Sequence, residues 1–224
     1  PSELFDGLDI NTGLVVFSTN QQFLLSSDDT ILNPDTAKLR SISTFNYNKD
    51  IAPISLGTTI GFVDNSGKFS RFSEMANVSR EGEPNVVEAS KVIPTLLPKS
   101  LNLLTNSREN GIVLFGKDGS DTVQGFRYLN VADKRQQSAW FQWKFNNPLR
   151  YHFIVNDEYY FLDSDNFLQS LRLVQTESDP AIIQDNVDFL LHLDNHTTLD
   201  NGSFNSTTNI TTFTGVSWLN LVTS

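Results

Sequence analysis

The chain lacks cysteine altogether, which excludes disulfide bonds and thiolate metal sites. No stretch approaches the roughly 18–20 consecutive apolar residues that span a bilayer, so we expect no membrane partner. Charged residues are sparse at 19%, and 26 acidic against 16 basic side chains leave a formal net charge of −10. This balance argues against a surface that grips nucleic acid, because such a surface is basic. It still allows DNA to pass close by, since an acidic wall repels phosphate.

Helical patterns are scarce as well. The best candidate, Val86 to Ile93, is too short to matter and is closed by Pro94. Elsewhere Ser, Thr, Asn, Asp and Gly interrupt the chain every 8–12 residues or so, as in an all-β architecture. With 224 residues, 38% of them hydrophobic and 17 of them Phe, the chain can bury a sizeable core. The fold class that these features favour is all-β.

Four hairpins of one design follow each other along the chain. Each is an apolar β-rich run, a turn of Asn, Asp or Gly type that tolerates positive φ, and a second apolar run. The four segments are Leu14–Leu25, Thr59–Phe72, Gly111–Leu129, and Tyr151–Val174, which continues into an extra strand. Measured from Gly13, Thr59, Gly111 and Tyr151, the steps are 46, 52 and 40 residues. A β unit recurring about every 40–50 residues is typical of propeller blades.

Two domains are expected. Residues 1–176 would form a propeller-like region of about four antiparallel blades, with short outer strands or blade crossings inside the connections 26–50 and 80–99. Residues 177–224 would be a linker and a Thr/Asn-rich β segment of a neighbouring domain. Within it, Val187–Leu193 and Asn209–Phe213 alternate in the manner of exposed antiparallel strands.

The aromatic segment Gln137–Phe145 is the most distinctive string. As a strand it places Trp143 on one face with Phe141 and Phe145, and Trp140 on the other, more polar face. The first face is expected to pack between two blades, with Trp143 buried, because large aromatics dominate core burial. On the second face, Trp140 could instead stack on a sugar or a partner.

Carboxylates gather at the turns, in a set comprising Asp28, Asp29, Asp64, Asp118, Asp121, Asp163 and Asp165. Glycosidases need two carboxyl groups at a defined separation, but an Asp in a turn usually serves its backbone hydrogen bonds. The run Asp163–Asn166 faintly resembles a calcium loop, although Phe167 stands where a third oxygen ligand is needed. The turn-forming interpretation is favoured throughout.

The three histidines, His152, His192 and His196, show no metal-type pairing that fits their context. His192 and His196 are four residues apart, which serves zinc on a helix but not in a strand and turn. No Ser-centred nucleophile motif, Gly-rich phosphate loop or interleaving of basic and aromatic residues is present. We therefore expect no enzyme, no cofactor and no catalytic, cofactor-binding or metal site; residues facing a DNA lumen cannot be assigned.

An ordered series of strings resembles the tail tubular protein B, or tail nozzle, family of short-tailed bacteriophages, the podoviruses of the autographivirus type. The strings are Leu14–Phe17, Gln21–Leu25, Ala52–Gly57, Phe69–Glu74, Gln136–Trp143, Phe153–Val155 and Phe189–Asp194. The Gln-Ser-Ala-Trp-x-x-Trp string at 137–143 is the most specific of them. Full nozzle proteins are much longer, and this chain starts with Pro1, so we interpret it as an internal piece of such a protein.

The resemblance implies a structural virion protein assembled in the bacterial host cytoplasm. Six copies would form the distal tail tube, bound to the tail adaptor or gatekeeper ring and flanked by tail fibres. The tube would conduct double-stranded DNA without binding it specifically. The family has no catalytic residues to assign to this chain.

Two alternatives stay open on the residues alone. A propeller or β-sandwich protein that binds or cleaves carbohydrate would also explain the repeats, the aromatic strand and the clustered Asp residues. A cell-surface adhesin fragment would explain the Thr/Asn-rich tail, but not the aromatic string. The arrangement of polar groups discriminates between them, because an enzyme needs carboxylates that converge in one pocket.

Overall fold

The computed structural model describes residues 3–27, 33–131, 134–173, 181–184, 187–190 and 203–212. The chain divides into two compact units, residues 1–174 and 175–224. Almost all regular structure is antiparallel strand, and a single 3-10 turn, η1 (Ala89–Val92), is the only helical element of the described residues. No described helix is long and apolar enough to cross a membrane. The all-β prediction is therefore confirmed.

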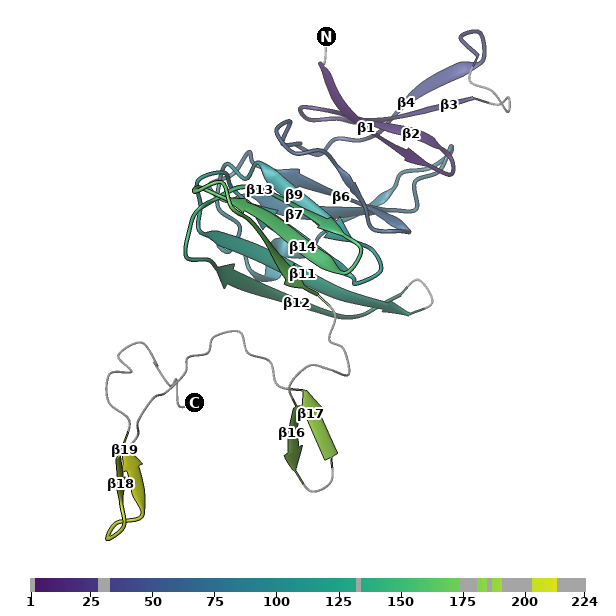
Figure 1. Ribbon diagram of the computed structural model, residues 1–224. Coiled ribbons are helices and arrows are strands. Elements are labelled where there is room, and N and C mark those ends of the chain that lie inside the picture. The colour runs from purple at the N-terminus through teal and green to yellow at the C-terminus, as the bar shows by residue number, and fades with distance from the viewer. Residues whose placement is uncertain are drawn as a thin grey trace. The chain divides into compact units, whose positions relative to one another are not determined.

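The first unit contains four antiparallel meander sheets in chain order (Figure 1). The first sheet contains β1 (Leu4–Ile10), β2 (Gly13–Ser18), β3 (Gln22–Ser27) and β4 (Ala37–Ser43). The second contains β5 (Ile54–Ser55), β6 (Thr59–Asp64), β7 (Arg71–Ala76) and β8 (Asn85–Glu88). The third contains β9 (Leu103–Ser107), β10 (Ile112–Gly116), β11 (Thr122–Val131) and β12 (Lys134–Lys144). The fourth contains β13 (Leu149–Val155), β14 (Glu158–Asp163) and β15 (Leu168–Arg172).

The second unit contributes two short hairpins. One pairs β16 (Ala181–Gln184) with β17 (Val187–Leu190), and the other pairs β18 (Ser203–Asn205) with β19 (Ile210–Thr212). Both strands that alternation predicted in this region are present over the residues that the structure describes there, as β17 and β19. Phe213 lies outside the described residues, as does the end of the predicted 187–193 strand.

The predicted hairpins appear as neighbouring strands β2–β3, β6–β7, β10–β11 and β13–β14–β15. Their turns use the predicted chemistry, for Asn156 and Asn166 adopt φ of 53° and 67°, and Gly119 adopts 82°. The predicted outer strands within the connections are β4 and β8. The Val86–Ile93 segment is strand β8 followed by the 3-10 turn, and β7 starts at Arg71 rather than at Lys68.

The fourth predicted hairpin starts one strand earlier in its sheet than the first three do. In the first three units the predicted hairpin starts with the second strand of a sheet, whereas Tyr151 lies in the first strand of the fourth sheet. The matching second strand is β14, which starts at Glu158. Counted between second strands, the repeat is more regular, at roughly 46–53 residues, close to the spacing of propeller blades.

The core lies between consecutive sheets rather than inside any one of them. Val15 and Phe17 of the first sheet pack with Ile60 and Phe62 of the second. A second cluster joins the second sheet to the third through Phe72, Phe115 and Phe126, and a third joins Leu114 to Tyr159 and Phe161 of the fourth. These clusters, the three found in the described part of the chain, link consecutive sheets only. The sheets therefore form an open array that packs face to face in chain order, as propeller blades do.

Central strands of this array are apolar on both faces. On β10, Val113 and Phe115 belong to the cluster with the second sheet, while Ile112 and Leu114 belong to the cluster with the fourth. Successive strand residues point to opposite faces, so a strand covered on both sides is a continuous apolar run. This requirement explains the runs that identified the hairpins in the sequence.

Candidate functional site

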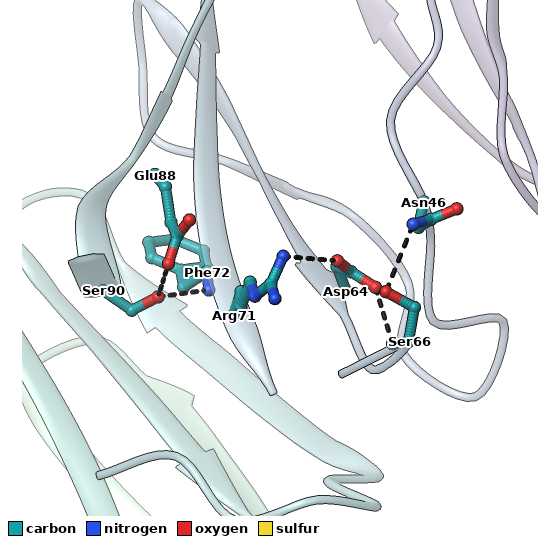
Figure 2. A network of polar contacts seen from close by, with 7 residues as sticks. All are labelled: Asn46, Asp64, Ser66, Arg71, Phe72, Glu88 and Ser90. Carbon is teal, nitrogen blue, oxygen red and sulfur yellow. Dashed lines mark hydrogen bonds and ion pairs between the residues drawn. The ribbon is translucent and has the colours of Figure 1, made fainter. Parts of the chain in front are cut away.

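The turn carboxylates serve the turns in which they lie. Asp64 Oδ1 accepts the backbone N–H of Ser66 at 2.7 Å, and Asp64 Oδ2 lies 3.9 Å from the guanidinium of Arg71. Ser66 Oγ accepts a hydrogen bond from Asn46, in the connection that leads from the first sheet, as Figure 2 shows. In the same network Ser90 Oγ accepts the backbone N–H of Phe72 at 3.0 Å, which fastens the 3-10 turn to β7. These contacts define local structure.

The segment that resembles a calcium loop is an Asp-centred turn. Asp163 Oδ1 accepts the backbone N–H groups of Asp165 and Phe167, both at 2.9 Å, and Asp163 Oδ2 accepts from Gln169 Nε2 at 2.7 Å. The hydrogen bond from Phe167 leads those that hold the pKa of the Asp163 carboxyl below its usual range. A carboxylate occupied by donors in this way is not available to a cation.

The remaining turn residues of this set differ in their contacts. Asp121 pairs with the exposed Lys144 at 3.7 Å, and the backbone N–H of Asp118 is held by Asn102 Oδ1. Asp28 and Asp29 lie outside the described residues. No group of three or more potential metal ligands occurs among the residues that the structure describes.

Trp140 is a packing residue rather than an exposed platform. Its ring stacks on Phe115 at a centroid distance of 5.7 Å and lies 4.6 Å from Phe126, between the second and third sheets. Trp143, on the opposite face, lies 5.8 Å from Tyr159 of the fourth sheet. Trp143 is half-buried and packs against the cluster between the third and fourth sheets, so the predicted burial is only partial. β12 is the edge strand of its sheet and carries aromatic side chains toward both neighbouring sheets.

His152 is buried between the third and fourth sheets, 2% exposed, with its Nδ1 3.0 Å from the Tyr159 hydroxyl. Burial lowers its pKa to about 4, and Nε2 has no hydrogen-bond partner. The imidazole is therefore neutral at physiological pH and belongs to the core. His192 and His196 lie outside the described residues.

An ion pair between sheets is the main polar feature that the sequence did not indicate. Arg135 on β12 donates two hydrogen bonds to Glu74 on β7, at 3.0 Å and 2.7 Å, and a third to Asn130 at 2.7 Å. Its guanidinium also lies 4.7 Å from the ring centroid of Tyr128. Glu74 is only 9% exposed and accepts one further hydrogen bond, from Thr59 Oγ. Bidentate geometry and partial burial make this a stronger contact than an ordinary surface pair.

Tyr128 lies against this ion pair with its hydroxyl buried and without a hydrogen-bond partner. Burial raises the pKa of the phenol, with Glu74 adding to the increase and Arg135 opposing it. The phenol is therefore protonated and is not suited to act as a base. The arrangement connects two sheets and offers no reactive group to a substrate.

The long hairpin of β11 and β12 extends beyond its sheet. Its paired residues run from Thr122 with Lys144 to Val131 with Lys134, and Leu129 and Val131 near its tip are exposed. A groove beside it is lined by two turns, Leu56–Thr58 and Arg108–Gly111, and by the hairpin's own strands at Arg127–Asn130 and Gln137–Ala139. Exposed apolar side chains at a hairpin tip, next to an open groove, are features of a protein contact surface rather than of a closed reaction pocket.

The outward face of the fourth sheet carries several apolar side chains. Tyr151, Phe153, Tyr160, Leu162 and Leu168 occupy matching positions of its three strands. Phe153 and Tyr160 stack with ring centroids 5.3 Å apart, and Leu168 is 60% exposed. A contiguous apolar sheet face of this kind indicates an assembly contact.

Comparison with known protein families gives a match over almost the whole chain. The model of the family described as bacteriophage nozzle protein matches residues 1–220, nearly the whole chain. No curated protein matches the chain.

Proposed function

The chain belongs to the bacteriophage nozzle protein family, and we propose that it is part of the subunit that forms the distal DNA-ejection conduit of a short phage tail as a hexameric ring. The family makes it a structural component of the virion tail. The observation that carries the proposal is the family match over residues 1–220, which includes all four stacked sheets.

The sheet array suits a load-bearing wall. Three clusters of buried side chains run between consecutive sheets, and the Glu74–Arg135 ion pair crosses one of these contacts. Interiors packed in this way have low compressibility and transmit strain. A conduit that must keep its bore while DNA passes needs such stiffness, and it needs no catalytic group.

The charge also supports the proposal. Each Lys or Arg that contacts phosphate adds salt-dependent affinity, and many such contacts would slow a translocating duplex. A formal net charge of −10 with only 16 basic residues suits a wall that DNA passes without specific binding. The same charge would keep an abundant structural protein soluble.

Two of the features that favoured a carbohydrate-binding or carbohydrate-cleaving protein, the aromatic strand and the clustered Asp residues, have structural roles here. Trp140 packs against Phe115 and Phe126. Asp64 and Asp163 accept hydrogen bonds from the backbone of their own turns, and Asp121 pairs with Lys144. No described feature favours a carbohydrate site over an assembly role.

The partners proposed are five further copies, the tail adaptor or gatekeeper ring, the tail fibres and passing double-stranded DNA, with assembly in the host cytoplasm before the tail is completed. The direct test is gold labelling of phage particles with antibodies raised against residues 1–174. Label at the distal end of the tail supports the proposal. Label on the capsid or along the fibres, with an unlabelled tail tip in both intact and detergent-opened particles, would contradict it.

A further inference from the structure

The contact between the third and fourth sheets encloses His152, the one histidine that the structure describes. His152 lies on β13 and is 2% exposed. Its ring lies against Gly116 of β10, where an added Cβ would be 3.1 Å from His152 Cε1. Nδ1 lies 3.0 Å from the Tyr159 hydroxyl, and Nε2 has no hydrogen-bond partner among the described residues. The imidazole is therefore held between the two sheets, out of contact with water.

The surroundings of this ring are poor in charge. The neighbouring strands of the third sheet, β9 and β10, contain no ionisable side chain, and β12 presents aromatic rings to this side. On β14 the ionisable side chains of the same face are Tyr159 and Asp163, and Asp163 is occupied by donors of its own turn. Arg127 on β11 and Arg150 on β13 are exposed. In the described structure a charged imidazole would therefore have only the Tyr159 hydroxyl as an acceptor.

Protonation of the enclosed ring is unfavourable. An imidazolium carries two N–H donors, and only the one on Nδ1 would find the Tyr159 hydroxyl. Burial also raises the pKa of the Tyr159 phenol, so no phenolate forms to balance the charge. A buried charge without partners is costly, and burial accordingly lowers the pKa of His152 from 6.5 to about 4. In water the same ring would regain its ordinary pKa.

We propose that His152 makes the contact between the third and fourth sheets an acid-sensitive joint. The ring lies between the sheets, so it reaches water only when they separate. Acid therefore favours a state in which the fourth sheet has moved away from the third and the imidazolium is hydrated. The contacts among the first three sheets enclose no described histidine, so they stay closed in the same pH range. The joint is a property of the packing within this chain and does not rest on the tail role.

The two pKa values of His152 set the size of the effect. The open state binds more protons than the closed state, because the exposed ring has the higher pKa. With a pKa of 6.5 when exposed and about 4 when enclosed, lowering the pH from 7 to 5 should raise the opening constant about 20-fold. Carboxyl groups ordinarily titrate near pH 4. Most of the change between pH 7 and pH 5 therefore belongs to His152.

The test is amide hydrogen exchange of the 224-residue chain, followed by NMR at pH 7 and pH 5. Three reporter amides donate hydrogen bonds across the joint. The Gly119 N–H donates to the Leu149 carbonyl, and the Leu149 N–H donates to the Ser120 carbonyl. The Ile154 N–H donates to Thr105 Oγ1 at 3.1 Å. Their protection, corrected for the intrinsic pH dependence of exchange, should fall about 20-fold at the lower pH.

The amides of Tyr47 and Asn48 are the matched control. They lie in the connection between the first and second sheets and donate to the Thr19 and Val63 carbonyls. These amides should keep their protection at pH 5, because their sheets remain packed. His152→Gln keeps a polar side chain but cannot titrate, so in this variant the reporter amides should lose no more protection than the control amides do.

Three results would overturn the proposal. Equal loss of protection at reporter and control amides would show general unfolding, and unchanged protection at both would show that the joint does not respond to acid. An undiminished loss at the reporter amides in H152Q would show that another group titrates. If H152Q does not fold, the ring signals of His152 in the unmodified chain decide. A ring that titrates near pH 6.5 while the reporter amides stay protected contradicts the joint, and a ring that titrates only as they lose protection supports it.

Discussion

Removing the Arg135 side chain tests how much the contact between the second and third sheets depends on one ion pair. In Arg135→Met the Glu74 carboxylate, 9% exposed, keeps only the hydroxyl of Thr59 as a donor. Breaking a fully buried pair costs about 3–5 kcal/mol. The Arg135 side chain is 29% exposed. Screening by solvent therefore reduces the expected loss of unfolding free energy to about 2 kcal/mol. For a unit of this size, a loss of that order lowers Tm by about 4–8 °C.

The assay is urea and thermal unfolding of the chain, followed by circular dichroism. Lys144→Met is the matched control: the pair of Lys144 with Asp121 is long at 3.7 Å and the Lys144 side chain is 73% exposed, so a loss below about 0.5 kcal/mol is expected. Arg135→Lys keeps the charge but loses the bidentate geometry and the stacking on Tyr128, so its loss should be intermediate. If R135M changes the free energy of unfolding no more than the control does, the ion pair does not stabilise the sheet contact and the reasoning fails.

Three further predictions follow from the geometry. Gly125→Ala should destabilise by about 1–3 kcal/mol, because a Cβ there would lie 2.0 Å from the Phe141 ring, while Gly7→Ala, whose Cβ meets the flexible Leu14 side chain, should unfold like the unmodified chain. Burial lowers the pKa of His152 to about 4, so between about pH 6.5 and 4 the folded state binds fewer protons than the unfolded state. The free energy of unfolding should therefore decrease as the pH is lowered through this window, by up to about 3 kcal/mol. In unfolding experiments from pH 7 to 4, His152→Gln should show a weaker dependence of stability on pH. Duplex DNA should show negligible affinity for the chain even at low ionic strength, and submicromolar binding in a gel-shift titration would instead indicate a DNA-gripping role.

The sequence predicted the hairpins because their strands are apolar runs. β2 and β10 are continuous apolar runs, and the turns after β10 and β13 contain residues with positive φ, Gly119 and Asn156. Strands without such a run were missed. β1 contains Asp6, Gly7 and Asp9 and is stabilised by pairing with β2, so its own pattern carried no strand signal.

The aromatic strand β12 contacts another sheet on each of its faces, and the sequence indicated only one of these contacts. Alternation correctly separated Trp140 from Trp143, but it could not show that both faces of β12 contact another sheet. The polar neighbours of Trp140 suggested solvent, whereas the second sheet supplies Phe72 to that side of the ring. The packing of the sheets decides which face of an edge strand is covered. The alternation of residues along that strand does not show how the sheets pack.

The ion pair could not be predicted at all. Glu74 and Arg135 are 61 residues apart in sequence, and neither has a charged neighbour that singles it out. The one local signal is that Glu74 falls in a strand otherwise buried, between Ser73 and Met75. A charge inside a buried strand requires a partner, but the identity of the partner comes only from the register of β11 with β12 and the packing of the two sheets.

The most direct test of the central claim is a cryo-electron microscopy reconstruction of the tail of the phage that encodes this chain. The account predicts that the four-sheet array fits density in the wall of the distal tube, six times around the channel. Absence of the array from the tube wall, or its presence only in fibres or capsid, would contradict the assignment of this protein as a nozzle subunit.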